Sequence, residues 1–265
     1  MTLPRLLMSP PEYFDVVYEI NPWMSVRRKV EKKHAVKQWE NYHRLLVDQL
    51  KVKVEILDPV RGLPDMVFTA NAGLVYKRLF VRSNFRHRER QGEEPYYEKW
   101  FKKKGYKVKT VDAPLNFEGE GDALFMGGEL FAGFHFRTDV VAHEIISGYI
   151  KRPYFSLELC DKRFYHLDTC FAPVDDKTAL VFMDAFEPYS RLGLLENIPD
   201  PIEVPEKEAL NFACNAVILG QDVILPEGCP KTEDALKKRG FRSHSLDFTE
   251  FLKAGGAAKC LVLKL

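Results

Sequence analysis

Four segments of this 265-residue chain share one pattern, in which two apolar, strand-like runs flank a short polar turn. They read "AGLVYKRLFVRSNF", "DALFMGGELFAGFHF", "TCFAPVDDKTALVFMDAF" and "CNAVILGQDVILPE", with turns at residues 76–78, 127–129, 175–177 and 220–222. Polar and glycine-containing turns between β-rich runs indicate β-hairpins. The pattern therefore predicts four hairpins spread along the chain.

Helical patterns follow three of these hairpins. They read "PYYEKWFKKKG", "DVVAHEIISGYI" and "KTEDALKKRGF", and the last closes on Gly240, a residue suited to a helix C-terminus. The first and third of these helices are followed by extended runs, "YKVKTVDA" and "RSHSLDF". Near the N-terminus, Val26, Val30, Trp39, Tyr42, Leu46 and Leu50 recur at helical spacing, and "KVKVEIL" then alternates as a strand.

Together these segments indicate a repeat. Five units in 265 residues give about 53 residues per unit, a period typical of repeat architectures. No Gly/Ser-rich linker divides the chain, so we expect a single domain over residues 1–265. We predict a five-fold ring of ββαβ units, in which strand ends line a central channel; chance similarity among hairpins is the competing explanation.

Composition excludes several classes of function. The formal net charge of +1 gives no basic excess for nucleic acid, and no run of apolar residues is long enough to span a membrane. The N-terminal apolar run is too short for a signal peptide, and the cysteine count of five is odd, so we expect reduced thiols and a cytoplasmic protein. The stretch "CDKRFYHLDTC" lacks a common zinc spacing, and no nucleotide or flavin motif occurs, so we expect neither metal nor cofactor.

The candidate functional residues precede the hairpins. Five stretches rich in polar groups or glycine lead into apolar strands: "PDMVFTAN" (64–71), "NFEGEGD" (116–122), "YHLD" (165–168), "NFACN" (211–215) and "GGAAKC" (255–260). In the last of them, Cys260 is expected at the start of a hydrophobic strand. In a ring, equivalent stretches converge on the centre, so we predict a site there.

The chemistry of these stretches is coherent. A cysteine with a histidine supplies a nucleophile and a general acid/base. Several carboxylates nearby favour a cationic ligand, and the planar guanidinium group matches paired carboxylates bidentately. Taken alone, each residue also has a structural interpretation, since a lone cysteine in an apolar segment is usually inert packing.

The stretches "INPWM", "FTAN", "FEGEGD", "GFHFRTD", "HLD" and "GGAAKC" resemble motifs of the guanidino-group-modifying (pentein) superfamily. Its members include arginine deiminases, dimethylarginine hydrolases, amidinotransferases and arginine dihydrolases. The resemblance extends from "INPWM" to Cys260 and implies a five-bladed α/β propeller, in agreement with the repeats. It also implies a hydrolase that acts on C–N bonds of linear amidines and needs no cofactor.

The resemblance further implies a role for each site residue. Cys260 is expected to be the nucleophile, His166 the general acid/base and Glu118 the guanidinium-binding residue that assists proton transfer. The residues expected to bind substrate are Asp168, Asn71, Asp65, Arg137, Arg86 and Asn21. Alternation along a strand would place His166 and Asp168 on one face. Glu120 remains an alternative to Glu118, and Arg88 and Arg90 remain alternatives to Arg86.

Position 71 narrows the expected reaction. Arginine deiminases read F-T-R-D where this chain reads "FTAN", and "INPWM" with "FTAN" is similar to arginine dihydrolases, which convert arginine to ornithine, carbon dioxide and two ammonia. The Asn71 amide can donate to a ureido oxygen, whereas an aspartate would repel it. Asp168 favours an unsubstituted guanidinium. A hydrolase that stops after one step, such as arginine deiminase or dimethylarginine hydrolase, is the alternative, and a non-catalytic propeller binding protein is the alternative of another class. The oligomeric state is left open.

Overall fold

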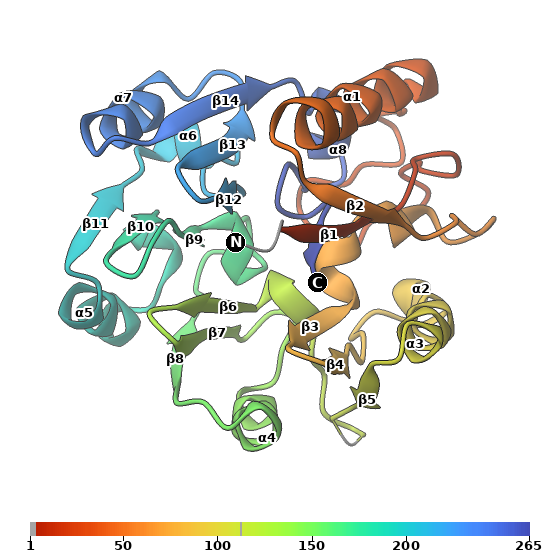
Figure 1. Ribbon diagram of the computed structural model, residues 1–265, viewed down its shortest axis with the longest axis horizontal. Coiled ribbons are helices and arrows are strands. Elements are labelled where there is room, and N and C mark those ends of the chain that lie inside the picture. Colours follow the sequence, from red (N-terminus) through yellow and green to blue (C-terminus); the bar gives the residue numbers. More distant parts are fainter. Residues whose placement is uncertain (1–3, 112) are drawn as a thin grey trace.

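The strands of the computed structural model, which describes residues 4–111 and 113–265, form five three-stranded sheets arranged as a ring (Figure 1). Each sheet is one blade, and a helix covers it on the outside of the ring (Figure 1). This arrangement confirms the predicted five-bladed α/β propeller.

Four blades follow the same ββαβ order. The first two strands form an antiparallel hairpin, a helix crosses over, and the third strand pairs parallel to the second. The strands are β3 Gly73–Tyr76, β4 Leu79–Arg82 and β5 Lys107–Lys109; β6 Ala123–Met126, β7 Glu129–Phe134 and β8 Tyr154–Glu158; β9 Phe171–Pro173, β10 Thr178–Val181 and β11 Asp200–Glu203; β12 Val217–Leu219, β13 Asp222–Pro226 and β14 Arg242–Leu246. The crossover helices are α3 Glu94–Lys103, α4 Val140–Ile150, α5 Pro188–Asn197 and α7 Pro230–Lys238. All four predicted hairpins are confirmed.

The remaining blade is built from both ends of the described chain. Strand β15 (Leu263–Lys264) pairs antiparallel to β1 (Arg5–Met8), which pairs parallel to β2 (Lys53–Ile56). The crossover is helix α1 (Lys32–Arg44), continued by a π-helical turn at Leu45–Gln49. The β15–β1 pairing closes the ring and holds the segment that contains Cys260 near the ring axis.

Two local expectations were wrong. The helix of this blade begins at Lys32, so Val26 and Val30 precede it; Val30 instead packs into the apolar core from an irregular segment. Cys260 lies in a turn, and only Leu263–Lys264 form the last strand. In addition, α5 was not predicted, because Tyr189, Leu192 and Leu195 expose apolar side chains that obscure its amphipathic period.

Shorter helical segments complete the structure. The short α-helices are α2 Arg88–Gln91, α6 Glu206–Ala209 and α8 Thr249–Leu252. Five further segments are 3₁₀-helical: Pro64–Val67, Thr69–Ala72, Gly119–Gly121, Leu167–Thr169 and Met183–Ala185. In the described part of the chain, no helix is both long and apolar enough to cross a membrane.

Packing between blades positions the functional segments. Phe131 of β7 and Phe171 of β9 stack across neighbouring blades with their ring centroids 5.3 Å apart. Such buried aromatic contacts favour one relative placement of the blades, since close-packed interiors tolerate little displacement. The 3₁₀ turns at Thr69–Ala72, Gly119–Gly121 and Leu167–Thr169 directly precede the hairpins and pack together near the ring axis. The stretches that contain these three turns therefore converge near the ring axis, as predicted.

Candidate active site

A small cavity lies where these turns meet, with an empty volume of about 260 Å³ that includes space open to solvent. The polar residues that line it include Asn21, Asp65, Asn71, Arg90, Arg137 and Cys260. A cysteine, a carboxylate, two amides and two guanidinium groups thus surround one small space.

The histidine and glutamate of the site form a buried pair. The Nε2 atom of His166 lies 2.8 Å from Oε2 of Glu118, and the same oxygen accepts a hydrogen bond of 3.0 Å from Nη1 of Arg137. Burial by itself raises the pKa of Glu118, but Arg137 and His166 outweigh it and hold that pKa well below its ordinary value. Glu118 is therefore a carboxylate that orients the imidazole ring.

This pairing leaves the second ring nitrogen of His166 available. Its Nδ1 atom is buried and has no hydrogen-bond partner among residues 4–111 and 113–265. A buried polar atom without a partner is unusual and indicates a place for a ligand or water. The geometry suits a general acid/base whose Nε2 is held by a carboxylate while its Nδ1 exchanges a proton.

Asn215 holds Cys260, the candidate nucleophile. The Nδ2 atom of Asn215 lies 3.1 Å from the sulfur of Cys260. The Oδ1 atom of Asn215 accepts hydrogen bonds from the backbone N–H groups of Ala257 (3.0 Å) and Cys260 (3.1 Å). One amide thereby contacts both the thiol and the turn that carries it. Asn215 was not among the predicted site residues; the signal was its position at the end of the "NFACN" stretch, which precedes β12.

The thiol also faces a carboxylate. The sulfur of Cys260 lies 3.5 Å from Oδ2 of Asp168. Burial, and then the charge of Asp168, raise the pKa of Cys260 well above its ordinary value, and burial raises the pKa of Asp168 to about 7. Both effects favour the protonated thiol, which donates to the carboxyl group of Asp168.

Two carboxylate oxygens in this region lack donors. Oδ1 of Asp65 and Oδ1 of Asp168 are buried without a hydrogen-bond partner in the described part of the chain, while Oδ2 of Asp65 accepts from the hydroxyl of Tyr18 at 2.9 Å. Burial raises the pKa of Asp65 although Arg90 lies nearby. Since an unsatisfied buried carboxylate oxygen is costly, these two oxygens suit a ligand with several N–H donors.

The amide of Asn71 has a defined orientation. Arg90 donates from Nη1 to Oδ1 of Asn71 at 2.8 Å, and its Nε and Nη2 atoms bind the two carboxylate oxygens of Glu93, each at 2.8 Å. An arginine only donates, so the atom that it contacts must be the amide oxygen. The Nδ2 donor of Asn71 is buried and unpartnered among the described residues.

Gly121 makes room for this donor. A Cβ atom at Gly121 would lie 2.5 Å from Nδ2 of Asn71 and 3.1 Å from the ring of His166. Because the glycine has no side chain, the Asn71 amide and the His166 imidazole can lie side by side. Asn71 therefore contributes an N–H donor that is fixed beside the His166 imidazole.

The predicted arginines lie in different places. Arg137 lines the cavity, where it pairs with Glu118 and donates from Nη2 to the carbonyl of Ile20 at 2.8 Å. The guanidinium of Arg86 binds Asp139 at 2.6 Å on a partly exposed face, and Arg86 does not line the cavity. Arg90, in contrast, does line it. The structure thus brings the open alternative Arg90, rather than Arg86, to the site.

Asn21 shapes the cavity wall through a turn. Its Oδ1 atom accepts from the backbone N–H groups of Trp23 and Met24, and its Nδ2 atom donates to the carbonyl of Ala254 at 3.0 Å. Both ends of this side chain are engaged within the protein. Asn21 consequently joins the N-terminal segment to the turn before Cys260 and lines the cavity at the same time.

The two candidate glutamates lie on opposite sides of one turn. Glu118 contacts His166, whereas Oε2 of Glu120 lies 2.8 Å from the ammonium of Lys259 and away from the cavity. His166 is extended, whereas Asp168 belongs to the 3₁₀ turn Leu167–Thr169. The prediction that strand alternation places these two side chains on one face was therefore wrong.

Comparison with known proteins found a family model and several relatives that match most of this chain. A family model described as N,N dimethylarginine dimethylhydrolase, eukaryotic, matches residues 18–265. The chain is 44% identical over 98% of its length to the bifunctional arginine dihydrolase/ornithine cyclodeaminase ArgZ of Synechocystis sp., and it spans 37% of that protein. It is 40% identical over 98% of its length to the N(G),N(G)-dimethylarginine dimethylaminohydrolase of Mycobacterium tuberculosis, of which it covers 85%.

A solved structure shows the same architecture. A variant of the N-terminal domain of ArgZ, covalently bound to a reaction intermediate, superposes with a TM-score of 0.94 at 43% identity. The superposition covers 98% of this chain and 97% of the solved one.

Proposed function

Since the chain belongs to the dimethylarginine dimethylhydrolase family, we propose that it hydrolyses the guanidino group of arginine by covalent catalysis through Cys260. We propose specifically an arginine dihydrolase, in which arginine and two water molecules give ornithine, carbon dioxide and two ammonia. Residues 1–265 act in this proposal as one catalytic domain, and the five free cysteines suit a cytoplasmic enzyme.

Charge favours entry of a cation. The buried carboxylates Asp65, Glu93, Glu118 and Asp168 outnumber the buried guanidinium groups of Arg90 and Arg137. A substrate guanidinium supplies N–H donors for the unpartnered oxygens of Asp65 and Asp168 and compensates their charge. Binding of the cation thereby stabilises the ionised form of both carboxylates.

The same cation activates the nucleophile. A positive charge beside Cys260 lowers the pKa of the thiol, against the effects of burial and Asp168. The thiol gives its proton to His166, which Glu118 holds in place, and the thiolate attacks the guanidinium carbon. The C–N bond then breaks, and the leaving amine takes this proton from His166. A covalent thiouronium forms, and water activated by His166 releases the ureido product.

The orientation of the Asn71 amide is the single observation that carries the assignment as a dihydrolase. Arg90 occupies its oxygen, so Asn71 presents an N–H donor beside His166. This donor matches the carbonyl oxygen of a ureido group and polarises it for a second hydrolysis. A single-step hydrolase needs no such donor, because its product leaves at this stage.

A second candidate substrate is dimethylarginine, since the chain shares 40% identity with the mycobacterial dimethylarginine dimethylaminohydrolase. Incubation of the purified protein with arginine or asymmetric dimethylarginine, followed by product analysis, separates the candidates. The dihydrolase gives ornithine and two ammonia per arginine. Citrulline with one ammonia per arginine indicates a single-step enzyme, and release of dimethylamine from dimethylarginine indicates the second candidate. Unchanged turnover in Cys260→Ser would refute covalent catalysis through Cys260.

A further inference from the structure

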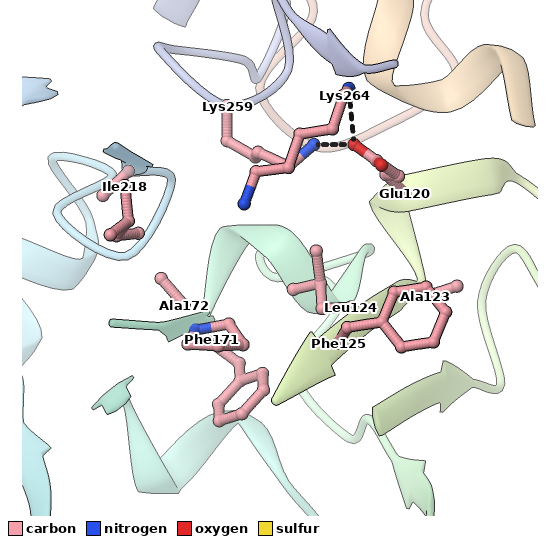
Figure 2. A pocket seen from close by; sticks show the side chains of 11 residues that line it. Glu120, Ala123, Leu124, Phe125, Phe171, Ala172, Ile218, Lys259 and Lys264 are labelled. Atoms are coloured by element: carbon pink, nitrogen blue, oxygen red, sulfur yellow. Dashed lines mark hydrogen bonds and ion pairs between the residues drawn. The ribbon is translucent and has the colours of Figure 1, made fainter. Parts of the chain in front are cut away.

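A second cavity, called here the rear cavity, shares no lining residue with the first one and includes Glu120 of the 3₁₀ turn Gly119–Gly121. This rear cavity has an empty volume of about 470 Å³ (Figure 2). The first strands of three blades supply its apolar wall, with Leu124 and Phe125 from β6, Phe171 and Ala172 from β9, and Ile218 from β12. Its charged residues are Glu120, Lys259 and Lys264.

One pair of these charges is already compensated. The ammonium of Lys259 lies 2.8 Å from Oε2 of Glu120, and both residues are buried. The same oxygen accepts the backbone N–H of Lys264 at 3.3 Å. Glu120 and Lys259 thus form a neutral pair that closes the rear cavity toward the catalytic side.

The third charge is not compensated. Figure 2 shows the side chain of Lys264 extending away from Glu120 into the cavity. Among residues 4–111 and 113–265, its ammonium has no hydrogen-bond or ion-pair partner. Lys264 is an exposed residue, so the lining carries one net positive charge where its mostly apolar walls meet solvent.

We propose that the rear cavity binds a small carboxylate with an apolar body, whose single negative charge pairs with Lys264. The apolar part would lie against Leu124, Phe171 and Ile218, where burial of its surface adds affinity. A phosphate dianion would bring a second charge without a cation to receive it, because Lys259 is engaged by Glu120.

The rear cavity is connected to the nucleophile through the chain. Lys259 directly precedes Cys260, and Glu120 lies two residues after Glu118. A carboxylate paired with Lys264 lies beside the Glu120–Lys259 pair and changes the charge next to the turn that carries the thiol. We therefore expect occupancy to alter turnover; this readout rests on the proposed function, whereas binding itself does not.

Benzoate is a suitable probe, since it combines one carboxylate with a flat apolar ring and is chemically inert. Calorimetric titration of the purified protein should show saturable binding of benzoate, and at least tenfold weaker binding of benzamide and inorganic phosphate. Lys264→Met should weaken benzoate binding at least tenfold. Lys207→Met on the outer helix α6 is the matched control and should leave binding unchanged.

A second variant keeps the test decisive if Lys264→Met fails to fold. Ile218→Trp fills the apolar side of the cavity and should also weaken benzoate binding. Equal binding to wild type, Lys264→Met and Ile218→Trp would place benzoate elsewhere, for instance at Arg137, and overturn the proposal. Equal affinity for benzamide, tighter binding of phosphate, or no saturable binding of benzoate would overturn it as well. If benzoate binds as expected but arginine is not hydrolysed, only the proposed function fails.

Discussion

The sulfur of Cys260 lies 3.5 Å from Oδ2 of Asp168, so the candidate nucleophile and the carboxylate that faces it share one buried space. Both carry pKa values above their ordinary ranges, because burial disfavours each charge and, for Cys260, the negative charge of Asp168 adds to this effect. In the proposed function, a guanidinium cation bound between the two groups stabilises both charged forms, so that substrate binding also activates the nucleophile.

The raised pKa of Asp168 predicts a pH-dependent effect on stability. An aspartate has a pKa of about 3.9 in an unfolded chain, whereas burial raises the pKa of Asp168 to about 7 in the folded protein. Between these values the unfolded state loses its proton first, so Asp168 costs more stability as pH rises from about 4 to about 7. Asp168→Asn should remove this cost and stabilise the empty protein above pH 7, by up to about 4 kcal/mol, while abolishing turnover.

Urea denaturation at pH 4.5, 6 and 7.5 measures this effect, and the stability difference between variant and wild type should grow with pH. Glu118→Gln is the matched control, since Arg137 and His166 lower the pKa of Glu118 against the effect of burial. The stability that ionised Glu118 contributes is lost only as pH falls below its unfolded pKa of about 4.3. The difference in stability between Glu118→Gln and wild type should therefore stay constant from pH 4.5 to 7.5. A pH-independent difference for Asp168→Asn would contradict the assigned pKa.

Asn71→Asp should change the products rather than the first chemical step. An aspartate still accepts the hydrogen bond from Arg90, but it offers no donor to the ureido oxygen. Loss of one such hydrogen bond is worth about 1 kcal/mol or more, so the ratio of citrulline to ornithine should rise about fivefold or more. Chromatographic analysis of products from arginine measures this ratio, and an unchanged ratio would exclude Asn71 from the second step.

Glu118→Gln and Glu120→Gln should differ in their effect on turnover, although the residues are two positions apart. Glu118→Gln removes the carboxylate that orients His166 and should lower kcat by about 10²-fold or more; it also leaves buried Arg137 without its carboxylate and should cost stability as well. Glu120→Gln leaves Lys259 buried without its carboxylate and should cost about 3 kcal/mol of stability. Per folded molecule, its turnover should fall less than tenfold. Steady-state rates and urea denaturation of both variants test the contrast, and a reversal would exchange the two roles.

Asn215→Asp should affect the thiol selectively. An aspartate keeps the acceptor for the backbone N–H groups of Ala257 and Cys260, but it loses the donor to the sulfur and adds a negative charge. The Asn215 side chain helps to lower the pKa of Cys260, so the variant should need a higher pH for the same rate of alkylation by iodoacetamide. Mass spectrometry in a Cys160→Ser background avoids reaction of the exposed Cys160. An unchanged pH profile would reduce Asn215 to a structural role.

Gly121→Ala should impair catalysis through one methyl group. Its Cβ atom would lie 2.5 Å from Nδ2 of Asn71, so the amide or the His166 ring must move. We expect a loss of at least tenfold in kcat/KM and a stability cost of about 1–3 kcal/mol. Gly148→Ala on α4 is the control, because a Cβ atom there meets nothing within 4 Å. Equal activity of the two variants would show that the space at Gly121 is not needed.

Local patterns were sufficient to predict most of the ring. The turns at Lys77–Arg78, Gly127–Gly128 and Gly220–Gln221 occur where polar or glycine residues separate apolar runs, because hairpin geometry depends on the few residues in the turn. The amphipathic helices were predicted for the same reason, since their periodicity is read within a short window. The residues Cys260, His166 and Glu118 could be named because their motifs resemble those of a family with this chemistry.

Tertiary structure alone decided which side chains reach the cavity. Glu118 and Glu120 are separated by one residue, yet across the 3₁₀ turn one contacts His166 and the other contacts Lys259. Arg90 rather than Arg86 lies beside Asn71, because helix α2 directs one guanidinium inward and Asp139 holds the other outside. Asn215 meets Cys260 across 45 residues of sequence, and β15 closes the first blade from the far end of the chain. Local patterns encode turns and periods, whereas these relationships depend on how five blades pack around one axis.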